Sequence, residues 1–207
     1  MTEEEAREWM RLRFDVSRET SLAAYADLLR DEAAHQNLVS AASLESLWSR
    51  HFVDSAQLIP LADGARAGAW VDIGSGAGLP GLVVALLTER PVVLVEPRRR
   101  RAEFLRFAAL ALGIDNRVSV EQCRIEVYRP VSPAAVVSAR AVAELSQLLA
   151  GALHCTDSST IWLLPKGQGA QSEVDAARRT WQGIFHVEPS ITSPDSGIVV
   201  ARKVRKA

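Results

Sequence analysis

An aspartate followed by closely spaced glycines forms the segment of this chain best suited to bind a ligand. Asp72 lies in the apolar run Trp70–Ile73, which leads directly into the glycines Gly74, Gly76, Gly78 and Gly81. Glycine permits the sharp turn that joins a strand to a helix, and it lets a ligand approach the main chain at the start of that helix. We therefore expect a nucleoside cofactor to bind at this turn.

A second acidic residue is placed to contact the same ligand. The apolar run Val92–Val95 ends in Glu96, as expected of a strand that follows the helix after the glycine turn. A carboxylate at this position can accept hydrogen bonds from the two hydroxyl groups of a ribose. Glu96 is therefore the candidate ribose ligand.

The glycine pattern fits two classes of cofactor. Gly76–Gly81 matches the G-x-G-x-x-G pattern of dinucleotide sites, so NAD and FAD are both candidates. The longer pattern Asp72-x-Gly74-x-Gly76-x-Gly78 resembles motif I of the class I S-adenosylmethionine methyltransferases. The carboxylate of Asp72 suits a ligand with a cationic ammonium and sulfonium, and it would repel a diphosphate. We therefore expect S-adenosylmethionine, with an NAD-dependent oxidoreductase as an alternative.

Composition indicates an ordinary globular protein. The chain has 207 residues, of which 48% are apolar and 24% charged, with a net charge of −1. It begins with a polar, acidic stretch and has no apolar run of the roughly 20 residues needed to span a membrane. Cys123 and Cys155 have no metal-ligand spacing. We expect a cytoplasmic protein without a metal site or a membrane partner.

Two regions with different patterns follow one another along the chain. Residues 1–61 are predicted to form an N-terminal helical extension, with Ser43 capping a second helix that runs to about Ile59. Residues 69–207 alternate strands and helices, which predicts an α/β, Rossmann-like sheet covered on both faces. Strands are expected at 70–73, 92–96, 118–121, 134–139 and 160–164, with a final antiparallel pair at 184–188 and 197–203. Helices are expected at 80–88, 98–112, 142–153 and 171–181.

Charged residues recur where the expected strands end, the edge at which open α/β sheets bind ligands. Arg140 ends the fourth strand and Lys166 the fifth, and Arg98–Arg101 follow the second. Four arginines at the start of a helix oppose its dipole, which favours a phosphate-binding patch over a merely solvated face. Upstream of the turn, Arg50 and Asp54 have the spacing of an ion pair along one helix, with His51 beside them.

Several of these motifs occur in one order that resembles the small-subunit ribosomal RNA methyltransferase G family, formerly called glucose-inhibited division protein B. The motifs are Asn37-Leu38, Arg50-His51-x-x-Asp54-Ser55, Asp72 to Gly81, Ser138-Ala139-Arg140-Ala141 and Lys166-Gly167. The resemblance implies a class I S-adenosylmethionine methyltransferase with a seven-stranded sheet. It further implies methylation of N7 of guanine 527, in the 530 loop of 16S rRNA.

The charge pattern, the glycine motif and the resemblance together assign expected roles to individual residues. The expected cofactor-binding residues are Asp72, Gly74, Gly76, Gly78, Leu79, Glu96, Ile125, Glu126 and Arg140. The expected RNA-binding residues are Arg50, His51, Arg98, Arg99, Arg100, Arg101 and Lys166. The chain departs from the family after the second strand, where Pro97 and the four arginines replace a turn that often carries a lysine. The partner is expected to be 16S rRNA or the 30S subunit, and the protein a monomer.

The expected chemistry does not require a general base. Guanine N7 carries a lone pair and no proton, so catalysis can consist mainly of aligning the reacting atoms. The chain lacks the Asn/Asp-Pro-Pro-aromatic motif common in exocyclic-amine methyltransferases, and its cysteines are not in Pro-Cys contexts. Arg140 and Asp54 are the candidate catalytic residues. A small-molecule methyltransferase and a non-catalytic RNA-binding module remain alternatives.

Overall fold

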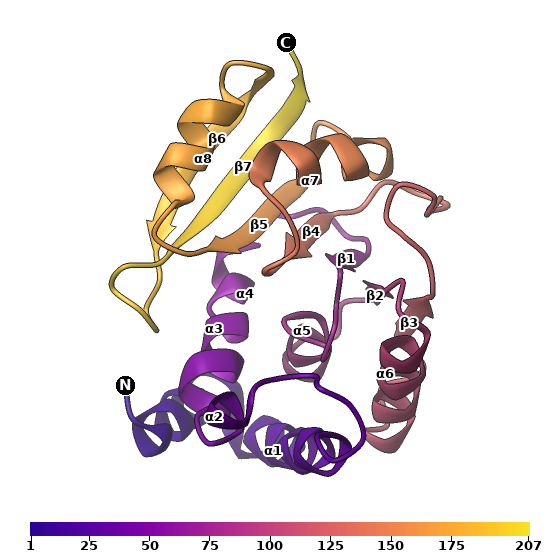
Figure 1. The fold of residues 1–207 in the computed structure, drawn as a ribbon, viewed down its shortest axis with the longest axis vertical. Coiled ribbons are helices and arrows are strands. Elements are labelled where there is room, and N and C mark those ends of the chain that lie inside the picture. Colours follow the sequence, from indigo (N-terminus) through magenta and orange to yellow (C-terminus); the bar gives the residue numbers. More distant parts are fainter.

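The computed structural model describes the whole chain, Met1 to Ala207, and its centre is one seven-stranded sheet (Figure 1). The strand order is β3-β2-β1-β4-β5-β7-β6. The strands are β1 (Trp70–Ile73), β2 (Val92–Val95), β3 (Val118–Glu121), β4 (Val136–Ala139), β5 (Ile161–Lys166), β6 (Trp181–Pro189) and β7 (Gly197–Lys206). The expected seven-stranded α/β sheet is confirmed.

The direction of the strands brings the candidate site residues to one edge. Strands β1 to β5 are parallel, and β7 pairs antiparallel with both β5 and β6. The chain runs outward from β1 through β2 to β3 and then returns to β4 on the other side of β1. This change of direction opens a crevice beyond the carboxyl ends of β1 and β4, where open sheets of this kind bind their ligands.

Helices cover both faces of the sheet and divide the core into two clusters (Figure 1). On one face, α5 (Gly81–Leu87) and α6 (Arg99–Ala111) pack together with the N-terminal helices. On the other, α7 (Leu145–Ala152) and α8 (Ala170–Ala177) cover β4 to β7. All residues of α5 are buried, because this helix lies between the sheet and the N-terminal helices.

The N-terminal extension begins with the long helix α1 (Glu3–Glu32), capped by Thr2 and Glu5. The helix is interrupted at Asp15, which has a φ of 68°. The Asp15 carboxylate accepts hydrogen bonds from the Arg18 N–H (3.0 Å) and from the Ser17 hydroxyl (2.7 Å), so it caps the second half of the helix. This break was not predicted.

The second predicted helix is wrong in detail, because the chain forms several short helical pieces instead. These are α2 (Ala41–Leu44), a π-helical turn (Trp48–Phe52), α3 (Val53–Ala56) and α4 (Leu58–Leu61). Ser40, rather than Ser43, caps α2: its hydroxyl accepts the N–H of Ser43. A π-turn adds a residue to the helical turn and rotates everything after it, which an apolar stripe does not reveal.

Other boundaries also differ from expectation. Helix α7 begins at Leu145 rather than at 142, because Ala141 has a φ of 55° and residues 141–144 are not helical. Helix α8 ends at Ala177, and Trp181 already belongs to β6. The last two strands are longer than expected because they pair with each other along most of their length.

The N-terminal helices share a hydrophobic cluster with α5 and α6, while the division into units at residues 1–61 and 69–207 stays a prediction. None of the helices combines the length and the apolar character that crossing a membrane would require.

Candidate functional site

The glycine turn joins β1 to α5, and its backbone explains the residue types. Gly74, Gly76 and Gly78 adopt φ angles of 65°, 57° and 91°. This left-handed region is costly for residues with a Cβ atom and free for glycine. The three glycines therefore allow a tight turn at the carboxyl end of β1.

A tyrosine from the N-terminal extension supports this turn from behind. Tyr25 of α1 is fully buried, donates a hydrogen bond to the carbonyl of Ala77 and stacks on Phe52, with ring centroids 5.5 Å apart. A Cβ atom at Gly78 would lie 2.7 Å from the Tyr25 hydroxyl and 2.5 Å from Cδ1 of Leu82. The N-terminal helices thus fix the shape of the turn.

The other side of the turn leaves room for a ligand. A Cβ atom at Gly76 would have no neighbour closer than the Gly74 carbonyl at 3.7 Å and Nη1 of Arg101 at 3.8 Å. Glu96 lies beside this point and is 3% exposed. Its Oε2 accepts the Gly76 N–H at 2.9 Å, and its Oε1 accepts the Arg98 N–H at 2.9 Å. The N–H groups of the turn and of the start of α6 therefore fix the orientation of the Glu96 carboxylate. A carboxylate fixed in this way is suited to accept hydrogen bonds from the two hydroxyl groups of a ribose.

Asp72 supports the turn by hydrogen bonds made inside the protein. It is fully buried, its Oδ1 accepts the Ser138 hydroxyl at 2.6 Å, and its Oδ2 accepts the Gly81 N–H at 3.2 Å. Burial raises the pKa of Asp72 to about 6, partly offset by these hydrogen bonds. In this arrangement the carboxyl ties β1 to β4 and to the first residue of α5.

The remaining predicted cofactor residues lie around the same edge. Leu79 is buried at the end of the turn, next to the cis peptide bond before Pro80. Ile125 is buried in the hydrophobic cluster that also contains the last residues of β1, β2 and β4. Glu126 is exposed, and both of these side chains lie within 4 Å of the position a Cβ would take at Gly151 of α7.

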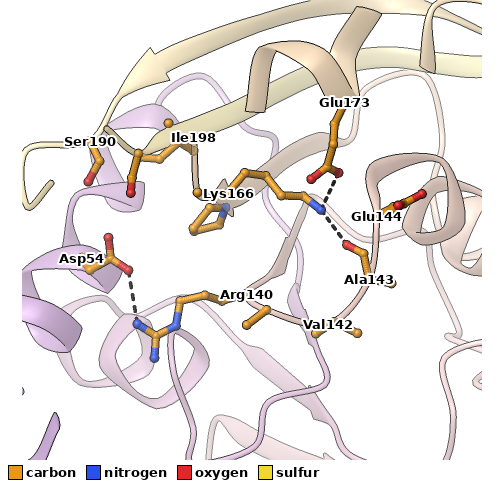
Figure 2. A pocket seen from close by; sticks show the side chains of 14 residues that line it. Asp54, Arg140, Val142, Ala143, Glu144, Lys166, Glu173, Ser190 and Ile198 are labelled. Atoms are coloured by element: carbon orange, nitrogen blue, oxygen red, sulfur yellow. Dashed lines mark hydrogen bonds and ion pairs between the residues drawn. The ribbon is translucent and has the colours of Figure 1, made fainter. Parts of the chain in front are cut away.

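Asp54 pairs with a residue distant in the sequence rather than with Arg50. Nη1 of Arg140 lies 3.2 Å from Oδ2 of Asp54 (Figure 2). Arg50 is exposed instead. The ion pair expected between Arg50 and Asp54 is therefore wrong. Oδ1 of Asp54 also accepts the Thr192 hydroxyl at 3.0 Å and the Gln57 amide at 2.8 Å. Asp54 thus joins the N-terminal extension to β4 and to the β6–β7 connection.

His51 belongs to the same cluster through one of its ring nitrogens, Nδ1. Nη1 of Arg140 lies 2.9 Å from Nδ1 of His51. Burial and the positive charges of Arg140 and Arg50 lower the pKa of His51 to about 4, so the ring is neutral at pH 7. An arginine can only donate, so Nδ1 accepts and Nε2 carries the proton. This Nε2–H is buried and has no hydrogen-bond partner.

A cavity of about 480 Å³ lies at this edge of the sheet (Figure 2). Its walls come from α3, the β4–α7 connection, the end of β5, α8 and the β6–β7 connection. Asp54 and Arg140 form one side, and Lys166 and Glu173 form the other. Nζ of Lys166 lies 2.9 Å from Oε2 of Glu173, and the lysine side chain is 9% exposed. Two charged pairs therefore face one space.

The arginines after β2 stand at the N-terminus of α6. Arg98, Arg99 and Arg100 are exposed, and Arg99 pairs with Glu103 at 2.7 Å. Arg101 is half-buried and leans towards Gly76. The structure thus places this basic group beside the glycine turn.

Sequence reasoning missed Tyr25 and Glu173. Tyr25 lies on the apolar stripe of α1, where nothing separates it from an ordinary core residue. Glu173 belongs to no motif, and its place beside Lys166 depends on how α8 packs.

The comparisons with known proteins agree with this geometry. Residues 18–195 match the family model GidB, described as rRNA small subunit methyltransferase G. A relative from Rhizorhabdus wittichii with the name ribosomal RNA small subunit methyltransferase G is 47% identical over 206 residues, covering 99% of this chain and 94% of its own. One of the same name from Zymomonas mobilis is 42% identical and covers 99% and 95%.

Solved structures show the same fold at low sequence identity. The glycopeptide N-methyltransferase MtfA complexed with S-adenosyl-L-methionine has a TM-score of 0.61 at 12% identity, over 73% of this chain and 94% of that one. TYW2 of P. horikoshii in complex with MeSAdo has a TM-score of 0.55 at 14% identity, over 75% and 64%. The fold is that of the class I methyltransferases. Together with the sequence match over most of its length, this shows that the chain belongs to the rRNA small subunit methyltransferase G family.

Proposed function

We propose that this protein transfers a methyl group from S-adenosylmethionine to N7 of guanine 527 in the 530 loop of 16S rRNA. Membership of the family supports an rRNA methyltransferase. The observation that carries the proposal is that a glycine turn with a pre-oriented Glu96 stands at the same sheet edge as a cavity lined by Arg140. A nucleoside cofactor and a second ligand can therefore be held side by side.

The residues of the turn fit the proposed cofactor. The backbone at Gly74 and Gly76 would lie against it, Glu96 would accept the ribose hydroxyls, and Ile125 and Glu126 would border the adenine. When bound, S-adenosylmethionine supplies an electrophilic methyl group on a cationic sulfur. The task of this chain is then to place a nucleophile in line with that group and to exclude water.

The state of the charged groups at the cavity suits a nucleophile that has no proton to lose. Asp54 and the Nδ1 atom of His51 are both engaged by Arg140. Neither is free to act as a general base in this arrangement. Both hydrogen bonds of the Arg140 side chain use Nη1. Nε and Nη2 are therefore available to an acceptor such as guanine O6, which neighbours N7 on the same edge of the base.

The proposed RNA contacts differ in how accessible they are. Arg50, Arg98 and Arg100 are exposed and can reach phosphates without any rearrangement, whereas Arg99 is exposed but pairs with Glu103. His51 is partly buried behind Arg140. Lys166 is held inside an ion pair. The exposed arginines therefore support the proposed RNA surface most directly.

The direct test uses 30S subunits, and separately naked 16S rRNA, from cells that lack this protein. Incubation with labelled S-adenosylmethionine should place one methyl group at N7 of guanine 527, located by cleavage at 7-methylguanine and by mass spectrometry. An RNA substrate with 7-deazaguanine at that position should accept no methyl group. Methylation of the 7-deaza substrate, or turnover of a small molecule without RNA, would contradict the proposal. Stabilisation by NAD but not by S-adenosylmethionine would overturn it completely.

A further inference from the structure

The connection between β4 and α7 leans against the glycine turn. Residues 141–144 form this segment, and Val142 within it is 43% exposed. A Cβ atom at Gly74 would lie only 2.7 Å from Cγ2 of Val142. The segment therefore closes one side of the turn that is proposed to hold the cofactor.

The segment does not hold this position by itself. Ala141 has a φ of 55°, which is strained for a residue with a side chain. Among the backbone groups of residues 141–143, only the carbonyl of Ala143 has a hydrogen-bond partner, and that partner is Nζ of Lys166. Its conformation must therefore depend on contacts from other elements.

Lys166 and Glu173 supply these contacts where the segment leads into α7 (Figure 2). Nζ of Lys166 donates to the Ala143 carbonyl at 2.6 Å and lies 2.9 Å from Oε2 of Glu173. The same Oε2 accepts the N–H of Leu145 at 2.6 Å, the first residue of α7. No side chain of the segment caps α7. Glu173, which belongs to α8, therefore accepts a backbone N–H at the start of α7 that would otherwise lack a partner.

We propose that Lys166 and Glu173 are positioning residues that hold segment 141–144 against the glycine turn and so determine how tightly S-adenosylmethionine is bound. The proposal rests on the proposed function. With its side chain 9% exposed and its ammonium shared between Ala143 and Glu173, Lys166 acts within the protein rather than on phosphate. Loss of either residue frees the segment and weakens its support of the turn.

The test measures S-adenosylmethionine affinity by calorimetry in the absence of RNA. Lys166→Met and Glu173→Ala should each weaken binding about tenfold, within the range of coupling found for residues in direct contact. Lys166→Arg, which keeps the charge, should restore most of the affinity. The matched control is Asp175→Ala, which removes a carboxylate from the same helix. This carboxylate contacts only Arg178 and Gln171, both away from segment 141–144, and the variant should bind as the wild type does.

Removing only Lys166 or only Glu173 leaves the other charge buried without its partner, and such a variant can unfold. A double variant that removes both charges covers this case. Lys166→Met combined with Glu173→Leu removes both charges, and it should fold and bind about as weakly as either single variant, because the two residues act as one unit. Wild-type affinity in this folded double variant would overturn the proposal. Failure of the wild-type protein itself to bind S-adenosylmethionine would instead overturn the proposed function.

RNA binding provides a readout that separates this role from phosphate contact. A lysine that binds a phosphate reduces the slope of log affinity against log salt by about one when it is removed. We expect Lys166→Met to leave that slope unchanged and to raise KM for S-adenosylmethionine far more than it lowers kcat. A slope reduced by about one, together with unchanged S-adenosylmethionine affinity, would assign Lys166 to the RNA surface instead.

Discussion

Burial of Asp72 makes the stability of this protein fall as pH rises through the weakly acidic range. Asp72 is fully buried, and burial raises its pKa from 3.8 to about 6. The folded protein thus holds this proton more tightly than the unfolded chain does. Between these two values unfolding releases a proton, and a higher pH favours unfolding.

The size of this effect follows from the pKa difference. Each pH unit corresponds to about 1.4 kcal/mol, so a difference of about two units amounts to ~3 kcal/mol. About 2 kcal/mol of this is lost between pH 4 and pH 7.5. Asp72→Asn cannot ionise, and it keeps an oxygen for the Gly81 N–H and an amide that can donate to Ser138. The substitution can also change the unfolding free energy by a fixed amount, but that amount does not vary with pH and does not affect the trend.

The assay is chemical denaturation of the wild type and of Asp72→Asn at several pH values from 4 to 7.5. The unfolding free energy of the variant minus that of the wild type should rise by about 2 kcal/mol over this range. Asp63→Asn, the same change at an exposed position before β1, is the control and should show no such trend. Parallel curves for Asp72→Asn and the wild type would refute the assignment of Asp72 as a buried carboxyl with a raised pKa.

Two further predictions concern the turn and the basic surface. Gly78→Ala should weaken S-adenosylmethionine binding more than tenfold, because its Cβ would meet the tyrosine of α1. Gly64→Ala, with a φ of 80° but open space around it, should bind normally. Equal affinities of the two variants, measured by calorimetry, would contradict this prediction. Arg98→Ala and Arg100→Ala should each lower the salt slope of RNA affinity by about one, measured by filter binding. Arg205→Ala, at the far end of β7, is the control and should leave the slope unchanged. A slope that is the same in all three arginine variants as in the wild type would show that the arginines after β2 do not bind RNA.

The sequence by itself determined the features that depend on local backbone chemistry. The turn from Gly74 to Gly78 was predictable because a strand that enters a helix through this sharp turn requires left-handed residues, and glycine adopts that conformation without strain. Glu96 was predictable because strands in a parallel sheet end at one edge, so a carboxylate after β2 must lie near the turn after β1. Apolar runs of strand length similarly predicted the sheet.

Only the tertiary structure decided which charged groups meet. Asp54 is one helical turn from Arg50 in sequence, yet it pairs with Arg140, because the π-turn at Trp48–Phe52 rotates the helix and the sheet brings β4 alongside. Lys166 finds Glu173 through the packing of α8. A side chain makes its ionic contacts with whatever the fold places within a few ångströms, and spacing along the chain does not encode those distances for residues far apart in sequence.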